Sequence, residues 1–385
     1  MIKLFGNSKK KETKLIHTFV GRNTAKLEEE LVYYGVKQLL EQEKITENDI
    51  EKIREDIRNE TYNITGVPFS DKNPNCIHVK MEFSNGLEFI CFGKSAETKE
   101  IEREFSVSKY ITDNSKGITV PPIYKSSDFI AFEFLDPREQ STITERMPNM
   151  AEKEKDEILE KIIDKISVYS NIPLNKKMTK LLKENDYVKE FKEWDFAKKL
   201  NYKHIAKTLN DNRLGIIENG LHPNNIVTGK DDSLLIIDFG KAMYGVPQTD
   251  LARAVLALGY EGTEKEEIAV ERLFQKYGKR FIEKCSDSED KEEAKNLCLK
   301  FEKAGSFEHF MEIYHLAKLH EYFKLAYKGE EIIREDKRLL SKPDLMSKYK
   351  LTIEEIKLGI DEAEKGKNRF IQNALNYAKL KNIKI

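Results

Sequence analysis

The sequence has little of what would make it a metal-stapled or disulfide-rich protein. Its 385 residues include only four cysteines, and none of them forms a Cys-x-x-Cys pair. Structural zinc and a disulfide framework are therefore not expected. Cys91 lies in an apolar, strand-like segment, where a thiol is expected to be buried as a small hydrophobic group.

The sequence also lacks long apolar runs and a dominant charge. No stretch of 18 residues is apolar throughout, so no transmembrane helix is expected. The opening residues MIKLFG contain no signal-peptide core, and a reducing cytoplasmic location is expected. The 66 Lys and Arg residues balance 67 Asp and Glu residues. Since the net charge is near zero, neither nucleic acid nor a membrane is expected as a partner.

What the chain does have is length and enough apolar residues for more than one core. Hydrophobic residues make up 39% of it and aromatic residues 10%. A chain of 385 residues exceeds what one small core usually organises, so two or three lobes are expected. The first of them, residues 1–60, is predicted to be an N-terminal helical extension. In it, Thr46 and Asp49 resemble a capping box ahead of isoleucines at helical spacing.

Residues 61–136 are predicted to form a small α+β lobe. Asn85-Gly86 supplies the positive φ angles of a hairpin turn between two strand-like segments. A helix and two further strands follow. The expected elements are strands at 76–83 and 87–92, a helix at 97–111, and strands at 120–124 and 129–135.

Residues 137–385 are predicted to form a large, almost wholly helical lobe. The exception is residues 225–240, where two short apolar segments form a hairpin. Near the C-terminus, Thr352 and Glu355 form a capping box that opens a helix.

Asp238-Phe239-Gly240 follows the apolar strand of that hairpin. A carboxylate at a strand end, before a glycine that permits a sharp turn, suits a Mg²⁺ ion that bridges two phosphates. Asn225 would offer a neutral oxygen to the same ion from the preceding loop. The hairpin between them is expected to bring Asn225 and Asp238 together.

Lys94 ends the second strand of the small lobe, where its ammonium could bind nucleotide phosphates. Glu104 lies ten residues on in the predicted helix, and we favour it over Glu102 as the partner of Lys94. Where the small lobe ends, the backbone around Glu133 and Leu135 would hydrogen-bond the adenine edge. Residues 65–70 are expected to be a loop, either an ordinary one or one that covers the phosphates.

The segment from Glu218 to Asn225 reads Glu-Asn-Gly-Leu-His-Pro-Asn-Asn. With Asp238 it resembles the aminoglycoside phosphotransferase and choline kinase family, which has a protein-kinase-like fold. That family's loop reads His-Gly-Asp-Leu-His-Pro-Gly-Asn, followed downstream by Asp-Phe-Gly and by Gly, Pro and Asp-Leu-Ala. The matching positions are Leu221, His222, Pro223, Asn225, Asp238, Phe239, Gly240, Gly245, Pro247, Asp250, Leu251 and Ala252.

The resemblance implies an α+β, bilobal, kinase-like fold, with a nucleotide-binding N-lobe at residues 61–136 and a C-lobe at 137–385 that carries the loop and the metal segment. It also implies ATP and Mg²⁺ as cofactors and a small-molecule hydroxyl as the acceptor. The chain departs from the family at Glu218, Asn219 and Gly220, because Gly220 stands where the family has its catalytic aspartate. Glycine cannot accept the proton of the acceptor hydroxyl.

Three hypotheses follow from this departure. In the first, the chain is a phosphotransferase whose base is Glu218 or His222. In the second, it is a nucleotide-binding pseudokinase that regulates a protein partner. In the third, it catalyses a related reaction such as nucleotidyl transfer. Because most catalysis of phosphoryl transfer is positional and electrostatic, loss of the aspartate does not by itself abolish turnover.

Overall fold

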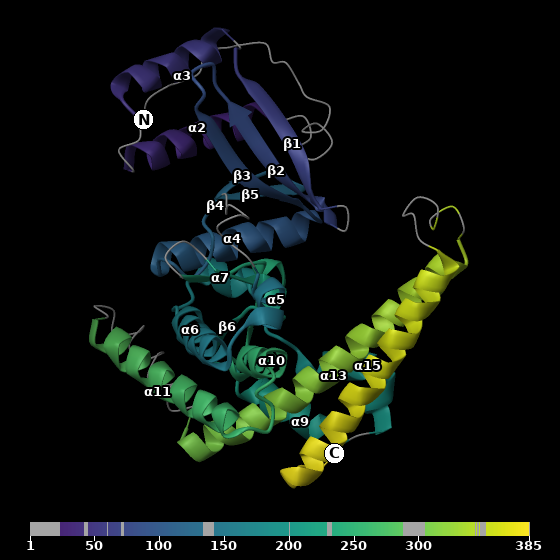
Figure 1. Ribbon diagram of the computed structural model, residues 1–385. Helices are drawn as coiled ribbons and strands as arrows, with labels where there is room; N and C mark the ends of the chain where they lie inside the picture. Colours follow the sequence, from purple (N-terminus) through teal and green to yellow (C-terminus); the bar gives the residue numbers. More distant parts are fainter. Residues whose placement is uncertain are drawn as a thin grey trace. The chain divides into compact units, whose positions relative to one another are not determined.

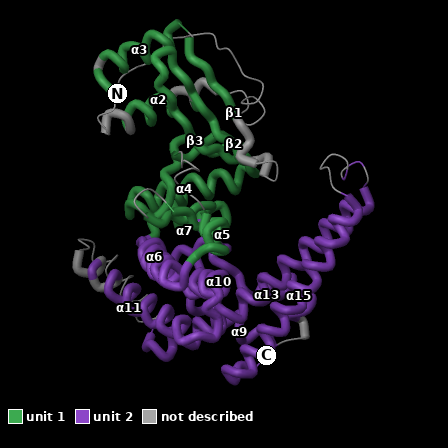
Figure 2. Tube along the Cα trace, in the orientation of Figure 1, with its two compact units in different colours: residues 1–150, 174–181, 223–242 green, residues 151–173, 182–222, 243–385 purple. Residues whose placement is uncertain are grey.

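The structure is a computed structural model, which describes residues 24–41, 45–59, 61–70, 73–133, 142–199, 201–228, 233–287, 305–342, 344, 346 and 352–384. The chain forms two compact units, coloured separately in Figure 2. Unit 1 comprises residues 1–150, 174–181 and 223–242, and unit 2 comprises residues 151–173, 182–222 and 243–385.

Unit 1 is built on a five-stranded antiparallel sheet with the order β1-β2-β3-β5-β4 (Figure 1). The hairpin predicted around Asn85-Gly86 is confirmed, because β2 and β3 pair on either side of it. Gly86 has a φ of 81°, which glycine adopts without strain. The strands are β1 (Asn63–Ser70), β2 (Asn73–Glu82), β3 (Glu88–Ser95), β4 (Pro122–Lys125) and β5 (Phe129–Glu133).

Side chains alternate between the two faces of this sheet, so each face has its own core. Along β3, Cys91 packs in a cluster with α2 (Thr24–Glu41) and α3 (Glu47–Asn59). The next residue, Phe92, packs on the opposite face with Ile101 of α4 (Thr98–Asn114). Helices α2 and α3 therefore cover one face of the sheet and α4 the other.

The helices expected before residue 60 pack on the sheet within unit 1. Leu27, Leu31 and Val32 of α2 are buried in the same cluster as Ile53 and Ile57 of α3. The Thr46–Asp49 cap is present, since the Asp49 N–H donates to Thr46 Oγ1 at 3.3 Å and the Thr46 N–H donates to Asp49 Oδ2 at 2.7 Å. Buried isoleucine positions thus direct α3 onto the sheet.

Residues 65–70 are strand rather than loop, which corrects the expectation for this segment. They belong to β1, where Thr65 pairs with Lys80 and Gly66 with Val79. Pro68 fits in the sheet because β1 is an edge strand, where a missing N–H can face away from the ladder.

The hairpin predicted at residues 225–240 is confirmed and belongs to unit 1. Strands β7 (Ile226–Thr228) and β8 (Leu234–Ile236) pair antiparallel. The Ile236 N–H donates to the carbonyl of Ile118 at 2.9 Å, and Ile237 packs against the sheet cluster that contains Ile101. Short helical elements of the same unit are α5 (Ile143–Arg146), η1 (Met147–Asn149), α7 (Lys176–Leu181), η3 (Pro223–Asn225) and η5 (Phe239–Lys241).

Unit 2 is mainly helical. One core among its described residues joins side chains of α8, α9, α13 and α15, and Phe191, Trp194 and Phe323 are buried in it. The capping box predicted at Thr352 and Glu355 is present at the start of α15. Its helical elements are α6 (Glu152–Ser170), α8 (Tyr187–Glu193), η2 (Asp195–Lys199), α9 (Tyr202–Asp211), α10 (Gln248–Leu258), α11 (Glu264–Asp287), α13 (Phe307–Leu340) and α15 (Ile353–Leu380).

A second short strand pair was not predicted. β6 (Gly215–Ile217) pairs antiparallel with β9 (Met243–Gly245) in unit 2. Three residues are too short to show an alternating pattern, and all three residues of β6 are buried, so the pair left no periodic signal. Gly215 is required there, because a Cβ would lie 2.0 Å from the carbonyl oxygen of Ser170.

The α+β class predicted from the sequence is confirmed, with one sheet-based unit and one mainly helical unit. Among the described helices, none is both long enough and apolar enough to cross a membrane.

Candidate functional site

Lys94, at the end of β3, is held by three carboxylates within unit 1. Its Nζ donates to Glu104 Oε2 at 3.0 Å and to Asp238 Oδ1 at 2.7 Å, and it lies 3.0 Å from Glu100 Oε1. Glu100 and Glu104 are four residues apart on α4 and therefore share the helix face that meets the strand end. The predicted pair of Lys94 and Glu104 is present, and it is extended by Glu100 and Asp238.

Glu102, the alternative to Glu104, lies elsewhere on the helix and pairs with Lys125. Residues two apart on a helix do not face the same side, so Glu102 cannot join Glu100 and Glu104. The i,i+4 spacing of the glutamates was the signal in the sequence that could have added Glu100 to the predicted set.

The charges of this cluster depend on one another. Burial alone would lower the pKa of the Lys94 ammonium, but Glu104 and Asp238 outweigh it, and the pKa of Lys94 is raised. Burial raises the pKa of Glu104 to about 7, in spite of the opposing effect of Lys94. The Glu104 side chain is 2% exposed and that of Asp238 is 42% exposed, so the cluster reaches from the core to solvent.

Asp238 is placed by an unusual backbone conformation. Its φ of 64° lies in the left-handed region, which aspartate tolerates better than most residues. Phe239 is buried beside it. A Cβ on Gly240 would lie 2.9 Å from Glu100 Cγ and 3.2 Å from Glu104 Oε2. The glycine therefore allows the chain after Asp238 to approach the two glutamates closely.

The hairpin register places Asn225 next to the Asp238 segment, as predicted. Ile226 pairs with Ile236, and the Ile237 N–H donates to the Asn225 carbonyl at 2.9 Å. Asn225 is buried, with 8% of its surface exposed.

The donor set of this region fits a hard cation. One carboxylate oxygen each of Glu100, Glu104 and Asp238 lie within 4.8 Å of one another. Oxygen ligands of this kind are those that Mg²⁺ and Ca²⁺ take in proteins. Lys94 supplies one positive charge to the three carboxylates, which leaves the cluster acidic when all three are ionised.

The two residues predicted to lie along the adenine edge are only partly described. Glu133 ends β5, pairs with Cys91 of β3, and donates its N–H to the carbonyl of Pro121 at 3.0 Å. Leu135 lies outside the described residues.

In unit 2, the carboxylate of Asp250 holds the segment after β6. The Glu218 N–H donates to Asp250 Oδ2 at 2.8 Å and the Asn219 N–H to Oδ1 at 3.2 Å. The hydroxyl of Tyr169 donates to Oδ2 at 2.6 Å. Burial raises the pKa of Asp250, while the hydrogen bonds from Tyr169 and Glu218 favour its charged form. Asp250 matches the family pattern in sequence, but only this geometry shows that its carboxylate binds the backbone of Glu218 and Asn219.

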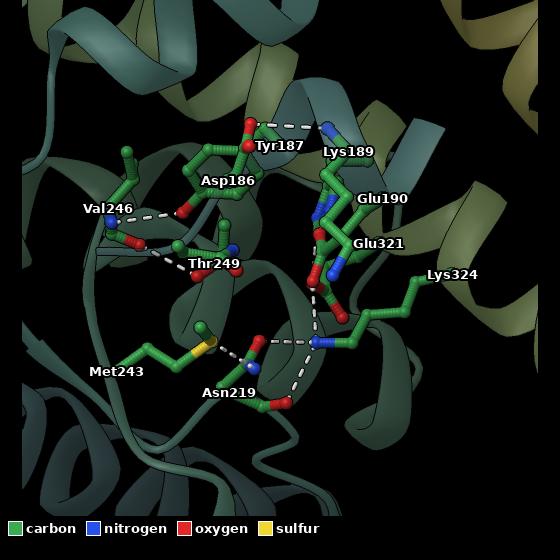
Figure 3. Close-up of polar contacts among 12 residues, drawn as sticks. Asp186, Tyr187, Lys189, Glu190, Asn219, Met243, Val246, Thr249, Glu321 and Lys324 are labelled. Atoms are coloured by element: carbon green, nitrogen blue, oxygen red, sulfur yellow. Dashed lines mark hydrogen bonds and ion pairs between the residues drawn. The ribbon is translucent and has the colours of Figure 1, made fainter. Parts of the chain in front are cut away.

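Lys324 of α13 binds the same segment from another direction (Figure 3). Its Nζ donates to the Asn219 carbonyl at 2.8 Å and to Asn219 Oδ1 at 2.7 Å. Asn219 Nδ2 donates to Met243 Sδ at 3.2 Å. No motif pointed to Lys324, because it is one lysine among many on a long helix.

Gly220, the residue at the position of the family's aspartate, has room for a side chain. The nearest atoms to a Cβ placed there are the carboxylate oxygens of Glu218, at 3.7 and 4.0 Å. Glu218 is buried, with 2% of its surface exposed. Its carboxylate therefore lies next to the space that an aspartate side chain at position 220 would enter. His222, the other candidate base, is half-buried after the buried Leu221.

Solved structures offer only distant likenesses. The chain is 12% identical to an ethanolamine kinase of Plasmodium vivax, with 96% of each chain covered and a TM-score of 0.47. It is 13% identical to a choline kinase of Streptococcus pneumoniae, with 69% of this chain and 98% of that one covered and a TM-score of 0.37. A macrolide 2'-phosphotransferase is 10% identical, with 83% and 98% covered and a TM-score of 0.43.

No curated protein matches the sequence. A model of the phosphotransferase enzyme family, in contrast, matches residues 92–284, which is half of the chain. The match spans the Lys94 cluster, the loop from Glu218 to Asn225, and Asp250. The chain belongs to the phosphotransferase enzyme family that includes the aminoglycoside phosphotransferases.

Proposed function

We propose that the protein is an ATP- and Mg²⁺-dependent phosphotransferase that acts on a small-molecule hydroxyl. One observation carries this proposal. Lys94, which is brought to the surface by β3, is bound at once by a buried glutamate of α4 and by the half-exposed Asp238. The binding of phosphates and of a metal ion needs an ammonium and carboxylates held close together in this way.

In this proposal, Lys94 exchanges part of its contact with Asp238 for the phosphate oxygens of the nucleotide. Asp238 and Asn225 would supply oxygen ligands to the metal ion, and Glu104 keeps the Lys94 side chain in place. Mg²⁺, when bound, would neutralise charge on the phosphates. The backbone at Glu133 and Leu135 would bind the adenine edge.

The transfer step needs an attacking oxygen and a place for its proton. The hydroxyl oxygen of the acceptor would bond to the terminal phosphorus of ATP while the bond from that phosphorus to the bridging oxygen breaks, which releases ADP. We assign the acceptance of the hydroxyl proton to the Glu218 carboxylate, because it lies beside the space left by Gly220. His222 is the second candidate for this role.

One observation favours a second function, that of a pseudokinase. Gly220 has no side chain where the family carries its catalytic aspartate, and Glu218 is 2% exposed. A protein of this kind would bind Mg-ATP and act on a protein partner through its shape rather than through phosphoryl transfer.

Binding and turnover separate the two functions. Mg-ATP binding is measured by calorimetry on the wild type, on Lys94→Met, and on Lys99→Met as a matched control at an exposed lysine of α4. A hydrogen bond to a charged group contributes about 1.5–3 kcal/mol, so Lys94→Met should weaken binding by about tenfold or more while Lys99→Met leaves it unchanged. Equal affinity of all three proteins would contradict the proposed nucleotide site.

Transfer is then measured as ADP release with a panel of aminated and neutral alcohols. The phosphotransferase is supported if the wild type turns over and Glu218→Gln loses about 10²- to 10⁴-fold in kcat, the usual loss for a positioned base. If the wild type binds Mg-ATP without turnover and Gly220→Asp gains activity, the pseudokinase is the correct function.

A further inference from the structure

Two side chains of opposite charge hold Asn219 from both sides. The Asp250 carboxylate accepts its N–H at 3.2 Å, and the Lys324 ammonium donates to its carbonyl at 2.8 Å. Lys324 also donates to the side-chain oxygen of Asn219 at 2.7 Å, so one ammonium binds both oxygens of this residue (Figure 3). Hydrogen bonds with one charged partner are roughly twice as strong as neutral ones.

The residue bound by this contact, Asn219, has an unfavourable backbone conformation. Asn219 has a φ of 68°, in the left-handed region that non-glycine residues adopt at a cost of about 1–2 kcal/mol. Such a conformation persists only where the surroundings enforce it. Asp250 and Lys324 both hydrogen-bond Asn219 in this conformation, and its side-chain nitrogen also donates to Met243.

The Lys324 side chain is itself held by a buried network. Its Nζ lies 3.9 Å from Glu321 Oε1, and His320 bridges Glu321 at 3.2 Å and Glu190 of α8 at 2.6 Å. Figure 3 shows Glu190, Glu321 and Lys324 leading toward Asn219. Glu321 and Lys324 lie on α13, a helix of 34 residues that packs in the buried cluster with Phe191 and Phe323, whereas Glu190 lies on α8.

We infer that Lys324 is a positioning residue for the segment from Glu218 to Gly220. It fixes the peptide group between Asn219 and Gly220 from α13, and with it the place of the Glu218 carboxylate beside Gly220. The catalytic consequence rests on the proposed phosphotransferase, whereas the structural role does not. The loop conformation of this chain thus depends on a lysine 105 residues away in sequence.

The test replaces Lys324 by methionine, which keeps the length of the side chain but removes its charge. Lys328→Met, one turn further along α13 at a 63% exposed lysine, is the control. Hydrogen exchange of the Glu218 and Asn219 amides, which donate to Asp250 at 2.8 and 3.2 Å, should become about tenfold faster or more in Lys324→Met, because this variant can no longer donate charged hydrogen bonds to Asn219. Lys328→Met should exchange as the wild type does.

A double-mutant cycle isolates the interaction between Lys324 and Asn219. Asn219→Gly tolerates the positive φ and removes the side-chain amide, both the oxygen bound by Lys324 and the nitrogen that donates to Met243, so Lys324→Met should accelerate exchange less in that background than in the wild type. Unchanged exchange in Lys324→Met would overturn the inference, since the bond from Lys324 to the backbone carbonyl is present in both backgrounds. Both measurements need no turnover, so they stand even if the proposed function fails.

If the protein does turn over, the role predicts a split in the kinetic constants. A misplacement of about 1 Å at a reacting group costs about 10²-fold in rate, so Lys324→Met should lower kcat by about that factor and leave the KM for ATP unchanged. Lys324→Arg, which keeps the charge, should recover part of the loss. A rise in KM for ATP without a fall in kcat would contradict a positioning role.

Discussion

Lys94 of unit 1 and Lys324 of unit 2 differ in the partners that hold them. Lys94 is bound by carboxylates, and one of these, Asp238, is 42% exposed. Lys324 is bound chiefly by the carbonyl and amide oxygens of one residue, Asn219. Ionic partners near solvent can be exchanged for phosphates or a metal ion, whereas two neutral oxygens in a fixed geometry define a conformation. The comparison separates a site built to bind from one built to hold its shape.

The largest effect is expected from removal of the Asp250 carboxylate, which accepts hydrogen bonds from the backbone segment that Lys324 also binds. Asp250→Ala leaves two backbone N–H groups and the Tyr169 hydroxyl without their acceptor in a buried region. The free energy of unfolding should fall by about 3 kcal/mol or more, as measured by urea denaturation. Asp250→Asn keeps one acceptor oxygen and should lose less. Equal stability of Asp250→Ala and the wild type would show that this segment does not depend on the Asp250 carboxylate.

A smaller effect on stability is expected from pH, through the network of His320, Glu190 and Glu321 next to Lys324. Burial opposes the charge on His320, but Glu190 and Glu321 raise its pKa above the usual value. The pKa of Glu321 is about 2, because Lys324, His320 and Arg253 outweigh the effect of burial. The stabilising contribution of His320 is therefore complete below about pH 6.5 and is lost as the pH rises through its folded pKa. That of Glu321 is complete above its unfolded pKa and is lost as the pH falls toward 2.

The variant His320→Gln tests this dependence by urea unfolding across about pH 5 to 9. The destabilisation relative to the wild type should be greatest at the acidic end and should shrink as the pH rises, because the wild type loses its own imidazolium contribution there. A difference that is constant with pH would mean that the pKa of His320 is the same in the folded and the unfolded protein.

The smallest effect is expected at Asn219 and Gly220, two adjacent residues at which the chain departs from the family pattern. Gly220 lacks a positive φ and a Cβ there meets only ordinary contacts, so Gly220→Ala should raise stability by up to about 1 kcal/mol. Asn219→Ala has the opposite sign, because alanine tolerates the left-handed region poorly and lacks the oxygen bound by Lys324. Thermal unfolding of both variants measures these opposite changes in stability. A loss of stability in Gly220→Ala would show that position 220 does not accommodate a methyl group.

Much of the fold could be read from local patterns. The turn at Asn85-Gly86, the caps at Thr46 and Thr352 and the hairpin before Asp238 all depend on residues close in sequence. Strand pair β6–β9 was missed because its three-residue strands are too short to show a period. The segment at residues 65–70 was misread as a loop, since Gly66 and Pro68 mark turns more often than edge strands.

The residues discussed as candidate site residues also divide into those predicted from local sequence patterns and those found only in the tertiary structure. The prediction of Asp238, Asn225 and Lys94 rests on strand ends and hairpin register, which are local properties, and that of Glu104 on its place in the helix that follows Lys94. The sequence alone determined the family pattern and the absence of a side chain at position 220. Only the tertiary structure decided that Asp250 and Lys324 hold Asn219, because hydrogen bonds between residues 31 and 105 positions apart leave no periodic trace in a sequence.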